Sequence, residues 1–199
     1  MSADVREMNH AAIGAVDLAR ASSAVEELLL ALGQDLTREE LQRTPHRVAR
    51  AFQEMLTPSP FDATKFPNSE GYDELVVVRD IAFSSLCEHH LLPFVGVAHV
   101  AYLPGTHIVG LSKLARVVDR YSKRLQVQER MTMQIADWLT DELSPRGVGV
   151  VVEAEHMCMR VRGAQAAGSS TTTSALRGRL RDDPRSRAEF LSLVRRAAP

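Results

Sequence analysis

Two pairs of β-rich segments, separated by two helical segments, constrain the fold of this chain most strongly. In chain order the β-rich segments cover residues 74–86, 94–105, 147–163 and 171–178. The members of each pair are close in sequence, so they can join as hairpins of an antiparallel sheet. Apolar periodicity predicts the two intervening helices over 110–125 and 127–143, with Ser112 as a candidate N-cap. The pattern predicts an α+β protein with a largely antiparallel sheet.

The N-terminal part of the chain has a helical pattern. A first helix is predicted over 21–34 and a second over 37–56, where Thr37 and Glu40 have the spacing of a capping box. Thr44-Pro45 resembles a new N-cap followed by a first-turn proline, so a helix is expected to restart there. This arm is expected to occupy residues 1–57.

A segment rich in Pro, Asn, Ser and Gly follows the arm over residues 57–73 and predicts a loop. The rest of the chain, 58–199, is expected to form one catalytic domain that closes with a helix over 183–198, opened by a proline. The boundary between the two parts is therefore predicted within this loop.

Composition excludes several classes of protein. The 199 residues carry a formal net charge of −1 and are 45% hydrophobic, which is ordinary for a globular domain. This balance gives no electrostatic reason to expect nucleic acid or an anionic membrane as partner. No apolar run approaches the length of a membrane span, and the N-terminus lacks a signal-peptide layout. We therefore expect a cytoplasmic protein.

A polar cluster, Cys-Glu-His-His, interrupts an otherwise apolar β-rich region. Buried polar groups cost free energy unless they are paired or bound to metal. Cys87 and His90 form a Cys-x-x-His pair, which is a common half of a zinc site. If residues 147–163 form one extended strand, His156 and Cys158 point to the same side and supply the second half.

Three protein ligands, Cys87, His90 and Cys158, are typical of a catalytic zinc site that leaves one position for water. His89 and His156 are further histidines that could transfer protons near neutral pH. If either also binds the ion, the site is instead closed and structural. Glu88 is expected to turn outward or to support the ligands.

Other polar residues suggest an anionic, nitrogen-rich substrate. Ser112 and Lys113 lie at the start of a predicted helix, where N–H groups favour anions, and Arg116 follows one turn later. The alternative is a solvated helix face. Glu129, beside Gln128, could accept two hydrogen bonds from an amidine-like edge such as that of guanine, or could only stabilise the start of a helix.

Two arginines follow the second half of the metal cluster. Strand alternation would place Arg160 and Arg162 on the same face as His156 and Cys158. They could neutralise phosphates or pair with surface acids. Together with the metal cluster, these residues favour hydrolysis of a phosphorylated heterocycle.

Four motifs in this order carry a resemblance to a known family: CEHHLLPFVG, GLSKLAR, RLQVQER and HMCMRVRG. The chain from about residue 37 to DPRSRAEFL resembles GTP cyclohydrolase I. The resemblance implies a tunnelling fold, in which antiparallel sheets with paired helices on one face associate into a toroidal homodecamer with sites between subunits. It also implies conversion of GTP and water to 7,8-dihydroneopterin triphosphate and formate, the entry to folate or pterin synthesis.

The resemblance also implies roles for individual residues. The Zn²⁺ ligands would be Cys87, His90 and Cys158. His156 would protonate the purine at N7 while an activated water attacks C8, and His89 would assist in ring opening. The remaining expected roles are guanine binding by Gln128 and Glu129, action near the ribose by Ser112, and triphosphate binding by Lys113, Arg116, Arg162 and, from a neighbouring subunit, Arg47.

Three alternatives remain open from the sequence. A paralogue in a specialised deazapurine or modified-nucleoside pathway would use the same first reaction. A non-catalytic zinc-binding regulatory subunit would keep the ligands but would not need both His89 and His156. A nitrile reductase of the same fold would use a nucleophilic cysteine with a nicotinamide cofactor, which the paired cysteine-histidine pattern disfavours.

Overall fold

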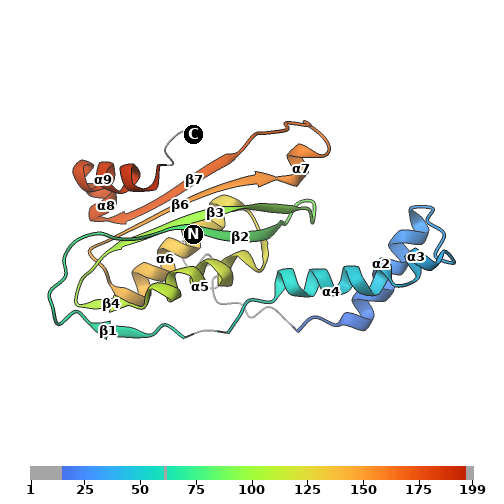
Figure 1. Ribbon diagram of the computed structural model, residues 1–199, viewed down its shortest axis with the longest axis horizontal. Coiled ribbons are helices and arrows are strands. Elements are labelled where there is room, and N and C mark those ends of the chain that lie inside the picture. Colours follow the sequence, from blue (N-terminus) through green and yellow to red (C-terminus); the bar gives the residue numbers. More distant parts are fainter. Residues whose placement is uncertain (1–14, 61, 196–199) are drawn as a thin grey trace, which may run out of the picture. The chain divides into compact units, whose positions relative to one another are not determined.

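The computed structural model describes residues 15–60 and 62–195 (Figure 1). The chain divides into two compact units, and the boundary between them in the sequence falls between Thr57 and Pro58. The described part of the N-terminal unit contains helices α2 (Leu18–Ala31), α3 (Glu39–Gln42) and α4 (Thr44–Leu56). Helix α2 begins at Asp17, whose carboxylate accepts a hydrogen bond from the Arg20 N–H. It ends just before Gly33, whose positive φ of 74° is typical of the residue that stops a helix.

The predicted capping box in this unit is wrong. The Thr37 hydroxyl donates to the carboxylate of Asp35 instead of capping a helix, and Arg38 is the N-cap of α3. The predicted restart at Thr44-Pro45 is confirmed, because α4 begins at Thr44 with a proline in its first turn. Its N-cap residue is Arg43, however, so Thr44 already belongs to the helix.

The second unit is built on a five-stranded sheet with the order β5-β2-β3-β6-β7. Its strands are β2 (Val76–Cys87), β3 (Pro93–Leu103), β5 (Leu125–Gln126), β6 (Gly147–His156) and β7 (Thr171–Gly178). All pairings are antiparallel except the short β2–β5 pair. The predicted α+β fold with a largely antiparallel sheet is therefore confirmed. A separate pair, β1 (Lys65–Pro67) with β4 (His107–Val109), places a short strand in the segment predicted as loop.

Helices cover both faces of this sheet (Figure 1). On one face α5 (Leu111–Ser122) and α6 (Gln128–Leu143) enclose the main core, which includes Val150 and Val152 of β6. On the other face α8 (Arg179–Asp182) and α9 (Pro184–Val194) pack against Val151. Alternation of side chains along an extended strand explains why neighbouring valines serve different cores.

Contact between α9 and the sheet requires a glycine. A Cβ atom at Gly149 would lie 2.7–2.9 Å from ring atoms of Phe190, which is fully buried. The aromatic ring therefore rests directly on the backbone of β6. This close approach fixes α9 to the end of the sheet where β6 begins.

Two predictions for the site-bearing segments are wrong. Strand β6 ends at His156, and residues Met157–Arg160 form a helical turn, α7, so strand alternation does not place Cys158, Arg160 or Arg162 on the face of His156. Ser112 is not an N-cap, because Gly110 has the extended backbone of that position and α5 begins at Leu111. Residues 157–160 thus form a helical turn in place of the predicted strand, whereas at α5 only the start of the helix differs from the prediction.

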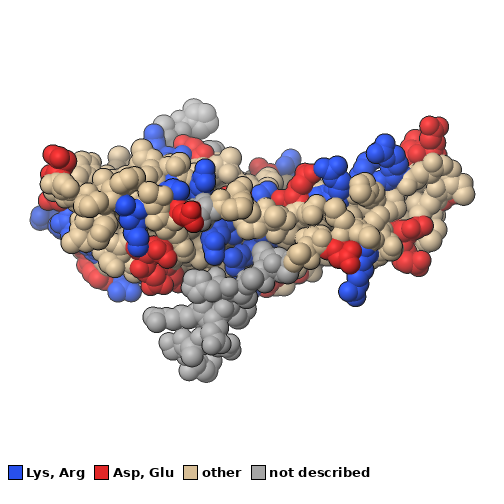
Figure 2. Space-filling view, turned by 90° about the horizontal axis from the view of Figure 1, so that it is seen from below, with Lys and Arg blue, Asp and Glu red and all other residues tan. Residues whose placement is uncertain are grey.

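Charged side chains of both signs are interspersed on the face shown in Figure 2. This distribution agrees with the formal net charge of −1. Among the described residues, no helix combines the length and the apolarity that crossing a membrane requires.

Candidate active site

The predicted metal ligands come from two segments at one end of the sheet, the turn that follows β2 and the helical turn that follows β6. Cys87 is the last residue of β2, and the turn that follows folds back so that the N–H groups of His90 and Leu91 both donate to the Cys87 carbonyl. Leu91 has a positive φ of 54°, which closes this tight turn. Cys158 lies on α7, immediately after β6. Strand β3, between β2 and β6, pairs with both and so brings the two segments to the same end of the sheet.

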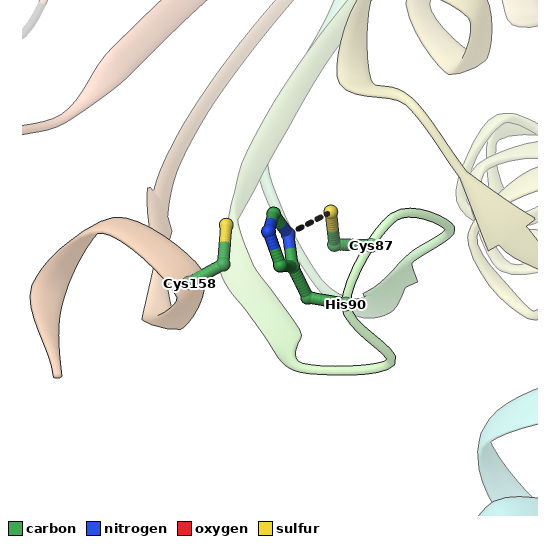
Figure 3. Close-up of side chains that lie close together, drawn as sticks. All are labelled: Cys87, His90 and Cys158. Carbon is green, nitrogen blue, oxygen red and sulfur yellow. Dashed lines mark hydrogen bonds between the residues drawn. The ribbon is translucent and has the colours of Figure 1, made fainter. Parts of the chain in front are cut away.

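The ligand atoms of Cys87, His90 and Cys158 all lie within 4.8 Å of one another (Figure 3). The Cys87 Sγ and His90 Nδ1 atoms are 3.7 Å apart. A tetrahedral zinc ion with ordinary bond lengths separates its ligand atoms by roughly 3.5–3.8 Å. Burial, and next the proximity of Cys87, raise the pKa of the Cys158 thiol. A divalent cation would offset this cost by stabilising the thiolates, so the donor set fits zinc.

Glu88 anchors the turn between the two ligands of the first segment. Its two carboxylate oxygens accept hydrogen bonds from the Arg130 guanidinium at 2.6 and 2.7 Å. The hydrogen bond from Arg130 holds the pKa of Glu88 below its usual value, although burial opposes this effect. A bidentate pair of this kind restrains both distance and orientation. Glu88 therefore ties the ligand turn to the first turn of α6, as a support for the ligands.

The two additional histidines differ in how firmly they are held. His156, at the end of β6, is stacked on the Phe94 ring, with ring centroids 4.7 Å apart and planes 4° from parallel. Its Nε2 atom lies 2.7 Å from the Gln128 Oε1 atom. Burial lowers the pKa of His156, while nearby Glu129 opposes this shift. The His89 side chain, by contrast, is 65% exposed, and its Nε2 atom lies 3.8 Å from the Glu88 Oε1 atom.

A cleft of 230 Å³ opens beside the metal-ligand group. It is lined by Cys87, His89, His90, Gln126, Val127, Gln128, Glu129, His156, Cys158, Met159 and Thr171. Pockets for whole drug-sized ligands are usually about 300–1,000 Å³. This cleft is therefore of a size to take a heterocyclic base, with the rest of a nucleotide outside it.

Comparison with known proteins identifies the family. The family model described as GTP cyclohydrolase I matches residues 21–195. The chain belongs to the GTP cyclohydrolase I family. GTP cyclohydrolase 1 of Mycolicibacterium vanbaalenii is 54% identical over 199 residues, with 96% of this chain and 98% of that protein covered. GTP cyclohydrolase 1 of Streptomyces avermitilis is 56% identical over 187 residues, with 92% of each chain covered. The chain is thus an enzyme of this family, and its α+β architecture agrees with the expected tunnelling fold.

The two residues expected to bind guanine, Gln128 and Glu129, differ in their exposure to the cleft. Glu129 is exposed at the rim of the cleft. Gln128 is only 1% exposed, and its Nε2 atom lies within hydrogen-bonding distance of the Val152 and Thr171 carbonyls. The amide of Gln128 is therefore engaged inside the chain. No sequence signal separates these adjacent residues, because the difference arises from which side of α6 faces the sheet.

The residues expected to bind phosphate are not gathered at this cleft. Ser112 and Lys113 lie in the first turn of α5, and Arg116 follows on the same helix. The other end of α5 leads into β5, which pairs with Cys87. Since α5 has 12 residues, its two ends are roughly 18 Å apart.

Two further arginines complete the expected set. Arg162 lies exposed just beyond α7, close enough to Cys158 that its charge opposes, to a small extent, the rise in the pKa of that thiol caused by burial and Cys87. Arg47 lies on α4 of the N-terminal unit, and its role stays a prediction. The described residues of one chain thus assemble the metal and base part of the expected site, but not its phosphate part.

Proposed function

We propose that this chain is a GTP cyclohydrolase I that opens the imidazole ring of guanine in GTP, releases formate and yields 7,8-dihydroneopterin triphosphate. The observation that carries the proposal is the convergence of Cys87, His90 and Cys158 beside His156 in a base-sized cleft, in a chain of this family. Hydrolysis of an aromatic ring needs an activated water and a proton donor in close proximity. This cleft supplies residues for both.

Each part of the cleft has a distinct task in this proposal. When bound at Cys87, His90 and Cys158, zinc supplies Lewis-acid activation of a water molecule near neutral pH. His156 delivers a proton to the ring nitrogen that leaves the attacked carbon, because a histidine can both donate and accept. The Glu129 carboxylate at the rim accepts hydrogen bonds from the guanine edge. His89, exposed beside the turn, exchanges protons with solvent during ring opening.

The triphosphate is bound by Lys113, Arg116 and Arg162, with Ser112 near the ribose. Because α5 is roughly 18 Å long and its C-terminal end is the one that leads to the metal ligands, the cations near its N-terminal end leave the phosphate part of the cleft incomplete in a single chain. A homo-oligomer, a decamer by family resemblance, would complete each site with the N-terminal end of α5 from a neighbouring subunit. Arg47 would extend the phosphate-binding surface from another copy.

The same proposal places the enzyme at the start of folate or pterin synthesis in the cytoplasm. Cys87 and Cys158 are free cysteines in a metal-ligand arrangement, which a reducing compartment preserves. Use of both cysteines as ligands also disfavours the nitrile reductase alternative, which needs one of them as a nucleophile.

The direct test is turnover of GTP by the zinc-loaded protein. We expect formate release and, after oxidation, a fluorescent pterin, and we expect a chelator to abolish both and added zinc to restore them. Absence of both products from a protein with a full complement of zinc would sink the proposal and favour the regulatory-subunit alternative. Reduction of a nitrile with a nicotinamide cofactor would instead identify a reductase.

A separate experiment tests whether each active site is formed between two subunits. Two inactive variants are assembled into mixed oligomers. Cys158→Ser removes a metal ligand, and Lys113→Ala removes a phosphate ligand. If sites form between copies, mixed oligomers contain some sites with both wild-type halves, and activity reappears. Mixed oligomers that remain as inactive as the two parents would show that one chain supplies both halves.

A further inference from the structure

Gln128 is a buried amide in the wall of the cleft, and its contacts indicate a different role from guanine binding. Its Nε2 atom lies 3.1 Å from the Val152 carbonyl oxygen, 2.9 Å from that of Thr171 and 3.2 Å from the Thr173 hydroxyl. Its Oε1 atom lies 2.7 Å from the Nε2 atom of His156. The two ends of this amide therefore face different groups.

The orientation of the Gln128 amide follows from the chemistry of its partners. Backbone carbonyls only accept hydrogen bonds, so the atom that faces Val152 and Thr171 must be the NH₂ group. The carbonyl end then faces His156, and it can only accept. Consequently the Nε2 atom of His156 must carry a hydrogen, and the exchangeable position on this imidazole is Nδ1.

The surrounding hydroxyls support the same orientation. The Thr132 hydroxyl donates to the backbone carbonyl of Gln128 at 2.8 Å, which uses its only hydrogen. The contact of 2.7 Å between the Thr132 and Thr173 hydroxyls must then be donated by Thr173. This leaves the Thr173 oxygen as an acceptor for the Gln128 NH₂ group. With this assignment every hydroxyl and amide hydrogen of Gln128, Thr132 and Thr173 has an acceptor. The reversed orientation of the Gln128 amide would place its carbonyl oxygen against the backbone carbonyls.

We propose that Gln128 is a positioning residue that holds His156 as the Nε2–H tautomer, so that Nδ1 is the atom that exchanges protons in the cleft. Stacking on Phe94 fixes the plane of the imidazole, and the bond to Gln128 fixes its rotation within that plane. The inference rests on the proposed role of His156 as proton donor. It assigns base recognition to Glu129, since both hydrogens of the Gln128 amide are directed at acceptors inside the chain.

The kinetic test uses Gln128→Met in the zinc-loaded enzyme, because methionine has a similar shape but no amide. We expect kcat for formate release to fall about 100-fold, at the low end of what general acid–base catalysis contributes. The dissociation constant for GTP should not change. Gln134→Met is the matched control: Gln134 is buried on the same helix and accepts a hydrogen bond from Gln126, so this variant should keep wild-type turnover.

A double-mutant cycle separates positioning from a general structural effect. In a His156→Ala background, Gln128→Met should cause no further loss, because the residue it positions is gone. An equal loss in both backgrounds, or weaker GTP binding with unchanged kcat, would overturn the inference. If His156→Ala itself retains formate release, the proposed role of His156 fails. Normal turnover by Gln128→Met beside an inactive His156→Ala removes only the positioning role.

The tautomer can also be observed without any variant of Gln128. In ¹⁵N-histidine-labelled, zinc-loaded protein, solid-state NMR distinguishes protonated from bare imidazole nitrogens, and the His156 signals are assigned by their disappearance in His156→Ala. We expect a hydrogen on Nε2 and none on Nδ1 in the neutral ring. A neutral ring with its hydrogen on Nδ1 would contradict the proposal even if Gln128→Met failed to fold.

Discussion

The five-stranded sheet has two different ends (Figure 1). Cys87 and His156 lie at the end where β2 and β6 stop. At the end where β6 begins, Phe190 of α9 packs against the backbone of Gly149. The first end is held by directed polar contacts between partly exposed side chains, such as the Glu88–Arg130 pair. The second is held by apolar packing, with Phe190 and Leu180 almost fully buried. The same sheet thus has a chemical end and a packed end.

This difference predicts which property each end controls. Polar groups at the chemical end adopt positions that suit a ligand, and they add little apolar burial to the folded state. The apolar cluster of the packed end, on the sheet face covered by α8 and α9, contains none of the residues proposed to bind metal or substrate. Substitutions at the two ends should therefore separate activity from stability.

The largest effect is expected at the chemical end, from Cys158→Ser. A serine hydroxyl does not replace a thiolate as a zinc ligand, so bound metal and formate release should fall together. The loss should exceed the roughly 10–100-fold that follows removal of an outer-shell partner of a metal. The melting temperature of the metal-free form should change little, since Cys158 lies half-buried on a single helical turn. Full turnover with one equivalent of zinc would remove Cys158 from the ligand set.

At the packed end, Phe190→Ala should reverse this pattern. Loss of a fully buried phenylalanine is expected to lower the free energy of unfolding by about 3–5 kcal/mol. Denaturant unfolding measures this change, and kcat per zinc-loaded site should remain that of the wild type. Leu193→Ala is the matched control on the same helix, because Leu193 is 42% exposed and should cost little. A fall in kcat at full zinc occupancy would show that the two ends are coupled.

Much of the fold could be predicted from the sequence because its signals are local. The four β-rich segments and the helices α5 and α6 are encoded in apolar periodicity, and antiparallel pairing follows from their order. The end of β6 was not predictable in this way, since Met157–Arg160 continues a β-like pattern but forms a helical turn. The capping predictions at Thr37 and Ser112 failed because a local hydrogen bond and a preceding glycine determine those helix starts.

The candidate site was predictable only where residue type specifies chemistry. The Cys-x-x-His spacing indicates a metal half-site, and the structure brings Cys158 to it by a helical turn instead of by the strand alternation that the sequence suggests. The partners of Glu88 and His156 could not be found this way. Arg130 and Gln128 are 42 and 28 positions away, and only the folded arrangement of α6 against the sheet brings them into contact.

A smaller effect at the chemical end is expected from Arg130→Met. This change leaves the Glu88 carboxylate without its bidentate partner and loosens the turn that carries Cys87 and His90. We expect zinc affinity to fall about 10-fold, the lower limit for an outer-shell partner, with kcat at saturating zinc largely retained. Competition with a chelator measures the affinity. Arg177→Met, which breaks the comparable Arg177–Asp137 pair between β7 and α6, is the control and should leave zinc affinity unchanged.

The smallest effect is a pH dependence at the packed end, where Asp183 caps α9. Hydrogen bonds from the Ser186 hydroxyl and then from the Arg185 N–H lower the pKa of Asp183 below its ordinary value. A lowered pKa in the folded state means that the carboxylate stabilises the fold fully above the unfolded pKa of about 3.9, and that this contribution disappears as pH falls through the folded value. Asp183→Asn keeps the shape of the cap but removes the charge. Its melting temperature should lie slightly below that of the wild type near pH 7, and the difference should vanish well below pH 4. A difference that persists unchanged at low pH would mean that ionisation of Asp183 contributes nothing to the packed end.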